Sequence, residues 1–268
     1  MISSNIVTEI SKAENIGWSI VEKDYFLTLL LEAVSASQFL RDNFVFKGGT
    51  ALRKIYFKHY RYSEDLDFTL KKHLTEKEIK EAWETVFEYL KKEHNADFRI
   101  NDFYSRKWFS DIKIQFIGLK GGKNTITLDI LSDEIIVDII KEEKVFNPYY
   151  GKTFSMPVYS MEEILAEKLR SLLQRTRVRD YYDAWYILTH SGDKINMKKV
   201  KEIFIKKVEQ KKLSFSSKDQ LLDHNKINQA GAYYQRQLGS HLKELPPFDK
   251  LIAELGAAIT KLNLSNLC

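Results

Sequence analysis

Asp65 and Asp67, two aspartates spaced two residues apart, are the side chains in this sequence best suited to chemistry on a phosphate ester. They lie in residues 61–70 (RYSEDLDFTL), where Leu66 and Phe68 alternate with polar residues. We therefore expect a half-buried strand with both carboxylates on its polar face. Magnesium is bound by carboxylate oxygens together with substrate phosphates, so such a pair can hold one or two Mg²⁺ ions against a triphosphate.

The pair alone is a weak signal, because 37 acids among 268 residues also produce acid-x-acid triplets by chance. A glycine turn just before it adds specificity. Gly48, Gly49 and Thr50 end an expected strand (FVFKGG) and begin an expected helix (TALRKIYFKHY) with Thr50 as its N-cap. Glycine lets the backbone approach a phosphate closely, and N–H groups at a helix start stabilise the anion. We predict that this turn binds a nucleotide.

A third acid, Asp129, lies in the alternating segment TITLDIL. Ile126, Leu128 and Ile130 share its apolar face, which puts Asp129 on the polar one. If this strand neighbours the strand of Asp65 and Asp67, the three carboxylates converge. Asp129 then either binds a second metal ion or takes the proton from an attacking hydroxyl.

The basic segment KLRSLLQRTRVR, residues 168–179, carries five cations and no acid. Lys168 is placed to bind the β and γ phosphates, and Arg175, seven residues later, returns to a similar helical face. The alternative is an ordinary solvated basic helix.

Asp180 and Asp183 follow directly in DYYDAWYIL. Their spacing fits N-cap and N3 positions, so they either cap this helix or position a substrate. The neighbouring aromatic residues favour helix packing over a base-stacking platform.

The expected elements define two lobes, residues 1–155 and 156–268, with the boundary in a loop that contains Gly and two Pro residues. Before it, helices are predicted over 18–40 and after Thr75, which with Glu78 has capping-box spacing. Strands are predicted in FRINDFYS, DIKIQFIGL and TITLDIL, the last two joined as a hairpin by KGGKN. After it the pattern is helical, starting with a second capping box at Ser160 and Glu163 and continuing around 196–211 and 248–263.

Composition supports a globular, cytoplasmic protein. Hydrophobic residues make up 44% of the chain, which excludes disorder, and the net charge of +5 is only mildly basic. The single cysteine, Cys268, cannot form an internal disulfide, and no Cys/His cluster suggests zinc. No signal peptide or membrane span is apparent, so no membrane partner is expected.

Two long segments resemble the AbiEii/AbiGii toxin family of nucleotidyltransferases. These are KGGTALRKIYFKHYRYSEDLDF and KLRSLLQRTRVRDYYDAWYIL, with further similarity at Glu22-Lys23-Asp24 and in QLGSHLKELPPFDKL. The resemblance implies an α+β fold: a polymerase-beta-like nucleotidyltransferase lobe with a mixed sheet, joined to a C-terminal helical lobe.

The resemblance also implies site residues and a biological role. The family's metal carboxylates fall on Asp65 and Asp67, and its second-motif lysine on Lys168. The other matching positions are Gly48, Gly49, Thr50, Arg61, Ser63, Asp180 and Asp183. The implied activity is Mg²⁺-dependent transfer of a nucleoside monophosphate from an NTP to an acceptor, with some relatives acting on the 3′ end of tRNA. A toxin–antitoxin or phage-defence role and a cognate antitoxin are implied as well.

Three alternatives stay open. The acceptor can be a protein hydroxyl, because nothing in the sequence fixes it. The chain can also be a non-catalytic NTP- or RNA-binding module, although paired carboxylates would repel a phosphate without metal. A structural or interaction protein built on the helical lobe would leave the carboxylate strand without a role.

Overall fold

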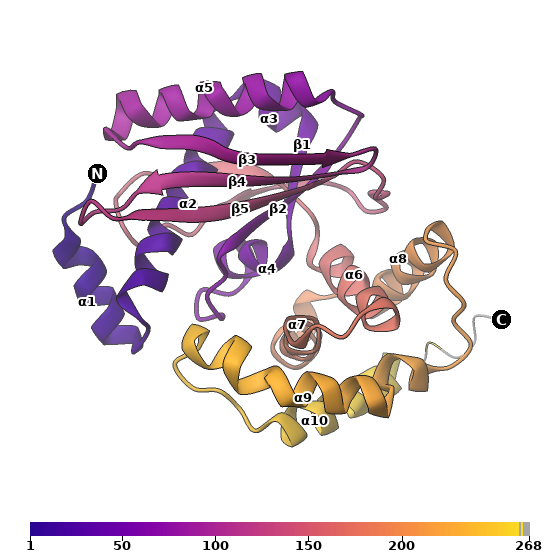
Figure 1. Ribbon diagram of the computed structural model, residues 1–268. Coiled ribbons are helices and arrows are strands. Elements are labelled where there is room, and N and C mark those ends of the chain that lie inside the picture. The colour runs from indigo at the N-terminus through magenta and orange to yellow at the C-terminus, as the bar shows by residue number, and fades with distance from the viewer. Residues whose placement is uncertain (263, 265–268) are drawn as a thin grey trace. The chain divides into compact units, whose positions relative to one another are not determined.

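The computed structural model describes residues 1–262 and 264 and divides into two compact units (Figure 1). The first unit comprises Met1–Glu134 and Ile140–Val158, and the second comprises Ile135–Ile139 and Tyr159 onward. Cys268 lies outside the described residues. Each unit is treated by itself below.

A seven-stranded sheet organises the first unit, with strand order β3-β4-β5-β2-β1-β7-β6. Strands β2 and β5 run parallel, as do β1 and β7, and the other neighbours are antiparallel. The fold is therefore α+β with a mixed sheet, as expected. The strand bounds are β1 Phe44–Lys47, β2 Asp65–Leu70, β3 Phe98–Arg106, β4 Phe109–Ile117, β5 Lys123–Leu131, β6 Lys141–Lys144 and β7 Ser155–Val158.

The helices of the first unit are α1 Ser4–Glu14, α2 Trp18–Ala36, α3 Gln38–Asn43, the short α4 Gly48–Ala51 and α5 Glu76–His94, with a π-helical turn at Leu52–Tyr56. The single helix predicted over 18–40 is wrong in one respect. Ser37 is extended, and its hydroxyl accepts a bond from Leu40 N to begin α3, so the chain breaks there.

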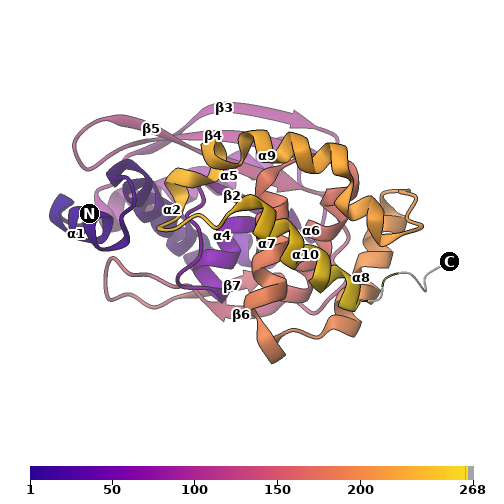
Figure 2. The same ribbon diagram turned by 90° about the horizontal axis from the view of Figure 1, so that it is seen from below.

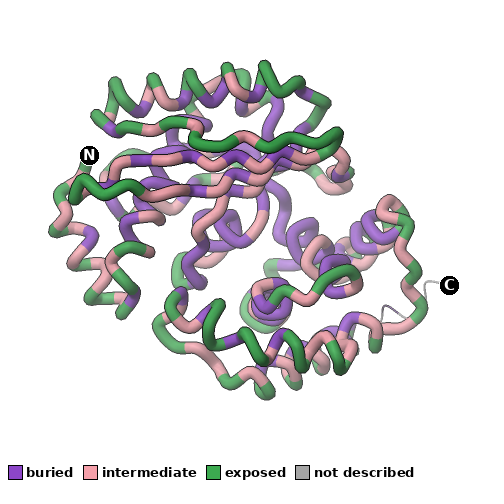
Figure 3. The backbone as a smooth tube through the Cα atoms, in the orientation of Figure 1, coloured by how far each residue is buried: buried purple, intermediate pink, exposed green. Residues whose placement is uncertain are grey.

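Helices α2 and α5 cover one face of the sheet and form the core with it. Phe26 of α2 stacks on Phe116 of β4 at 4.2 Å between ring centroids, and Trp83 of α5 contacts Phe68 of β2. Buried residues alternate with half-buried ones along β4 and β5 (Figure 3). The opposite face of these strands carries the polar side chains.

Two local predictions for this unit are confirmed. Thr75 and Glu78 form the reciprocal capping box of α5. The β4–β5 connection is a tight hairpin in which Gly121 has a φ of +79°, and a Cβ there would meet nothing within 4 Å. This glycine turn serves the hairpin, as its position between two strands predicts.

The predicted loop before the lobe boundary is partly wrong, because it contains β7. Pro157 lies opposite Glu142 of the edge strand β6, and Val158 pairs with Phe46 of β1. Proline masks the strand in the sequence, since it is uncommon inside sheets.

Helices build the second unit. Their bounds are α6 Met161–Gln174, α7 Val178–His190, α8 Met197–Gln210, α9 His224–Leu238 and α10 Phe248–Leu262, with 3₁₀ turns at Gly192–Lys194, Lys218–Leu222 and Gly239–His241. Helix α10 packs on α7, where Trp185 Nε1 donates to Glu254 at 2.8 Å (Figure 2). Tyr181, Tyr182 and Trp185 are buried, which confirms helix packing as their role.

Only one of the two hydrogen bonds of the second predicted capping box forms. Ser160 caps α6 by accepting from Glu163 N at 3.1 Å. The Glu163 carboxylate does not return that bond, because it accepts from Val137 N and Asp138 N and pairs with buried Lys207 at 2.9 Å. These bonds attach residues 135–139 to the second unit. No helix among the described residues is long and apolar enough to cross a bilayer.

Candidate active site

Three aspartates form a row across the polar face of the sheet. In the pairing register Asp67 of β2 lies opposite Asp129 of β5, and Asp129 lies opposite Asp111 of β4. Paired residues on neighbouring strands project from the same face, so the three carboxylates share it. Asp65 projects from that face two residues before Asp67 on β2. The expectation that β2 and the Asp129 strand are neighbours is confirmed.

Asp129 of this row is buried in an environment that disfavours its charged form. Burial is the main cause that raises its pKa to about 7, and the negative charges of Asp67, Asp111 and Asp65 add to the rise. Its Oδ1 atom is buried and accepts no hydrogen bond. A buried oxygen of this kind is costly unless a cation or proton satisfies it.

Lys113 of β4 partly offsets this effect, because its charge lowers the pKa of the Asp129 carboxyl. Lys113 Nζ lies 3.0 Å from Asp111 Oδ1 and 3.0 Å from Thr127 Oγ1. The lysine does not cancel the rise, and the pKa of Asp129 stays well above the ordinary aspartate value.

The raised pKa of Asp129 and its orphaned oxygen fit a site for a divalent cation. The orphaned Asp129 oxygen opposite Asp67 offers acceptor sites that Mg²⁺ prefers. Within residues 1–262 and 264, no three His, Cys, Asp or Glu side chains are grouped so that they could hold a metal ion on their own. Magnesium commonly takes one or two carboxylates and completes its shell with water and substrate phosphates, so an incomplete protein ligand set is compatible with it.

The Gly48-Gly49 turn fits closely against the site residues. Gly48 has a φ of +79°, and a Cβ there would overlap Asp67 Oδ2. A Cβ on Gly49 would overlap the Arg61 guanidinium and lie 3.3 Å from Ser63 Oγ. Gly48 is thus required by its backbone conformation and by Asp67, and a side chain at Gly49 would displace the Arg61 guanidinium, reasons that the sequence did not reveal. Arg61 and Ser63 are buried, at 2% and 6% exposure.

Thr50 does not cap a helix, so that prediction is wrong. Helix α4 begins at Gly48, with Lys47 at the N-cap position and no side-chain cap bond. The fully buried Thr50 hydroxyl instead donates to the backbone oxygen of Asp65 at 2.5 Å. Thr50 therefore fixes the start of β2, and with it the position of Asp65.

In the second unit, Lys168 is held between two buried carboxylates. Its Nζ lies 2.9 Å from Asp180 Oδ1 and 2.7 Å from Asp183 Oδ2, and the lysine side chain is 13% exposed. Burial alone would raise the pKa of Asp180, but Lys168 and Arg175 lower it. Lys168 is therefore mostly buried and ion-paired, unlike a lysine on an ordinary solvated basic helix.

The capping interpretation of Asp180 and Asp183 is wrong. Helix α7 begins at Val178 with Arg177 as N-cap, so both acids lie inside the helix. Arg175, at the C-cap of α6, pairs with Asp180 at 2.8 Å. The two acids thus join α6 to α7 through Lys168 and Arg175.

Glu22, Lys23 and Asp24, where the sequence shows further similarity to the family, each make a structural bond. Glu22 accepts from Leu119 N at 2.7 Å, and Lys23 pairs with Glu64 at 2.9 Å, next to Asp65. Asp24 is fully buried against Lys54 at 2.6 Å. These contacts support the strands that carry the acids.

Sequence reasoning missed Asp111. It begins an alternation, DIKIQFI, whose apolar residues are buried, so its own position on the polar face was readable. The hairpin predicted that β4 and β5 are neighbours. The sequence did not predict the register that places Asp111 opposite Asp129.

Comparison with known proteins gives the family. Residues 29–254 match the family model "Nucleotidyl transferase AbiEii toxin, Type IV TA system". A similar solved structure is MenT4, the nucleotidyltransferase toxin Rv2826c from Mycobacterium tuberculosis H37Rv. It has a TM-score of 0.72 at 17% identity, covering 98% of this chain and 90% of that one. No curated protein sequence matches the chain.

Proposed function

Because the chain belongs to the AbiEii nucleotidyl transferase toxin family of type IV toxin–antitoxin systems, we propose that it is a Mg²⁺-dependent toxin that transfers a nucleoside monophosphate from an NTP to the 3′ end of tRNA. Membership makes it a nucleotidyltransferase, with an NTP as substrate and an antitoxin as partner. The metal, the acceptor, a role in phage defence and action in the cytoplasm are parts of the proposal.

The orphaned oxygen of Asp129, opposite Asp67, carries the proposal for a metal-dependent reaction. Asp180, by contrast, is buried but has its pKa lowered by Lys168 and Arg175. A buried carboxylate with a strongly raised pKa is typical of functional sites, where a substrate or cation can stabilise its charge. Asp65, Asp67 and Asp129 are the residues that would hold Mg²⁺.

Nucleotidyltransferases of this kind generally use a divalent metal, which when bound neutralises phosphate charge and lowers the pKa of a nearby hydroxyl. The chain's own residues supply the rest. If Asp65 and Asp67 hold the metal, Asp129 beside them is the carboxylate placed to accept the proton of the attacking 3′ hydroxyl. The oxygen then attacks the α-phosphorus, a new P–O bond forms, and pyrophosphate leaves with the electrons of the broken P–O bond.

The remaining residues bind and orient. Arg61, Ser63 and the turn of Gly48, Gly49 and Thr50 hold the triphosphate in this proposal, and a side chain at Gly48 would overlap Asp67. In the second unit, Lys168 and Arg175 keep the nucleotide-binding role that the sequence predicts for them. Asp183 orients Lys168 through their 2.7 Å ion pair, and the Arg175 side chain is 45% exposed.

The test is transfer from each α-³²P-labelled NTP in the presence of Mg²⁺, with total tRNA, other RNA or a protein extract as acceptor. We expect label on the 3′ end of tRNA, removable by a 3′ exonuclease, and none with EDTA or with Asp67→Asn. Label on protein would replace the RNA acceptor with a protein hydroxyl. Binding of NTP without any transfer would leave a non-catalytic binding module.

A further inference from the structure

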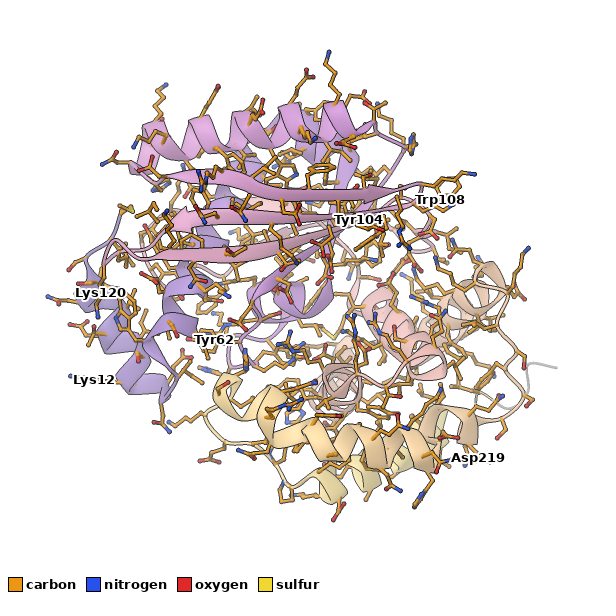
Figure 4. All side chains as sticks on the ribbon, viewed as in Figure 1. Lys12, Tyr62, Tyr104, Trp108, Lys120 and Asp219 are labelled. Atoms are coloured by element: carbon orange, nitrogen blue, oxygen red, sulfur yellow. The ribbon has the colours of Figure 1, made fainter. Side chains whose placement is uncertain are left out.

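The β3–β4 hairpin ends in a surface of aromatic and basic side chains, here called the hairpin tip and defined as Tyr104, Arg106, Lys107 and Trp108. Tyr104 and Trp108 are 44% and 46% exposed, which is unusual for large aromatic rings. They lie at the same end of the hairpin (Figure 4). The polymerase-like chemistry proposed above uses none of these residues.

Each ring of the hairpin tip carries a cation. The Arg106 guanidinium lies 5.3 Å from the centre of the Tyr104 ring and bonds to its hydroxyl. Lys107 Nζ lies 4.8 Å from the centre of the Trp108 ring, and the ring centroids of His73 and Trp108 are 6.5 Å apart. Exposed rings interleaved with cations are the combination that binds single-stranded nucleic acid, by base stacking and phosphate contacts.

The strand register also aligns Tyr104 with the row of acids. It lies opposite Asp111, which lies opposite Asp129, so its ring projects from the same face. Neighbouring strands are about 4.8 Å apart, so Tyr104 is about 10 Å from Asp129 along the row. A base stacked on Tyr104 can therefore belong to the nucleotide chain whose terminal hydroxyl reaches Asp129.

The order of the strands in the sheet indicates which of the two substrates, the NTP or the acceptor, would bind at the hairpin tip. The Gly48-Gly49 turn follows β1, on one side of the acid strands, whereas β3 forms the edge on the other side. In phosphoryl transfer the attacking and leaving oxygens lie on opposite sides of the phosphorus. If the triphosphate lies at the turn, the acceptor approaches from the β4–β3 side, where the hairpin tip is.

We propose that the hairpin tip binds the single-stranded 3′ end of the acceptor RNA, with a base stacked on Tyr104, a second on Trp108, and phosphates on Arg106 and Lys107. This inference rests on the proposed function, because it needs an RNA acceptor. It adds a substrate-binding surface in the first unit and assigns the hairpin tip to the acceptor, not to the NTP.

The experiment measures steady-state transfer with a short single-stranded RNA and an NTP, varying each separately. The variants are Tyr104→Ala, Trp108→Ala and Arg106→Ala/Lys107→Ala. Controls are Phe39→Ala, an exposed aromatic (40%) beside α5 on the other face of the sheet, and Tyr233→Ala, which is 46% exposed with Arg236 4.7 Å from its ring centre. Lys92→Ala on α5 controls for loss of an exposed charge.

We expect each hairpin-tip variant to raise the KM for RNA about 10-fold or more, since stacking of one base is worth that much. The KM for NTP and the melting temperature stay near wild type, and the controls change neither KM. An unchanged KM for RNA in all hairpin-tip variants would overturn the inference. A raised KM for NTP alone would assign the surface to the incoming base and overturn it as well.

The two failures are distinguishable in the same assay. If the wild-type protein transfers to no RNA, the proposed acceptor is wrong, and the hairpin-tip assignment falls with it. If the wild type labels RNA and the variants match it, only the hairpin tip is wrong. Quenching of tryptophan fluorescence by the same RNA, lost in Trp108→Ala but not in Phe39→Ala, gives a binding readout independent of turnover.

Discussion

The row of aspartates on the sheet and the charged cluster between α6 and α7 differ in how the charge of a buried carboxylate is stabilised. In the helical unit, Asp180 and Asp183 are buried but share Lys168, and the nearby Arg175 helps to lower the pKa of Asp180. On the sheet, Asp129 is buried beside other acids and its pKa rises to about 7. Sequence motifs marked both clusters as catalytic, but the pKa of the buried Asp129 is raised whereas that of the buried Asp180 is lowered.

This difference separates two kinds of buried carboxylate. A compensated cluster contributes to the fold as it stands, because each charge has a partner. An uncompensated one opposes folding in the absence of ligand and gains most from a bound cation. Asp24, buried against Lys54 and Arg53, is a second compensated case, within the same unit as Asp129. Substitutions in the three places should therefore behave differently.

The largest effect is expected at the sheet. Asp67→Asn should reduce nucleotide transfer about 1,000-fold, because metal charge stabilisation is worth several kcal/mol in the transition state. The melting temperature should stay near wild type, since asparagine has nearly the same size and shape as aspartate. Transfer rates with Mg²⁺ and calorimetry measure both, with Asp97→Asn, an exposed acid paired with Lys91, as control. Near wild-type transfer by Asp67→Asn would remove this acid from the metal site.

Substitution in a compensated cluster should do the reverse. Lys54→Met leaves the buried Asp24 carboxylate without its 2.6 Å partner, which should cost about 3–5 kcal/mol of unfolding free energy. Urea unfolding measures the loss, and transfer by the folded fraction should stay within a few-fold of wild type. Adding Asp24→Asn should recover part of the stability, because it removes the unpaired charge. Absence of any recovery would indicate that Lys54 acts through packing alone.

Substitution of Lys168 tests whether a lysine that is ion-paired within the protein can also bind the substrate phosphates. Lys168→Met should destabilise the protein by about 2 kcal/mol, since Asp183 loses its 2.7 Å ion pair with Lys168 while Asp180 retains Arg175. The double variant Lys168→Met/Asp183→Asn should regain stability. If Lys168 binds phosphates, the KM for NTP stays raised in the double variant. A KM for NTP that returns to wild type with stability would make the lysine purely structural.

The smallest effect is a gain in stability at Asp129. Its pKa is raised in the folded state from the ordinary value of 3.8 to about 7, so its ionisation opposes folding as pH rises between these values. Asp129→Asn should therefore raise the melting temperature at pH 8 by about 2–4 °C, for a gain near 1 kcal/mol, and by little at pH 4. Thermal unfolding across this pH range in EDTA measures the gain, while transfer is lost. A destabilised Asp129→Asn variant at pH 8 would contradict the idea of an uncompensated acid.

Local patterns in the sequence determined a large part of this protein. Alternation predicted that Leu66 and Phe68 are buried while Asp65 and Asp67 share the other face, and the same reasoning placed Asp129. The capping box of Thr75 and the β4–β5 hairpin were also predicted. These features depend on residues two to four positions apart, whose geometry the backbone conformation fixes by itself.

Other features were decided only by tertiary structure. The parallel pairing of β2 with β5 sets Asp67 opposite Asp129, and this brings together segments far apart in the chain. The same holds for the ion pairs of Lys168 across two helices, and for β7, whose proline hid a strand. Thr50 was misread because its hydroxyl bonds to Asp65, not to its own helix. Periodicity assigns a side chain to a face, but which charges then meet on that face depends on strand order and helix packing, and these are fixed by burial of the core as a whole.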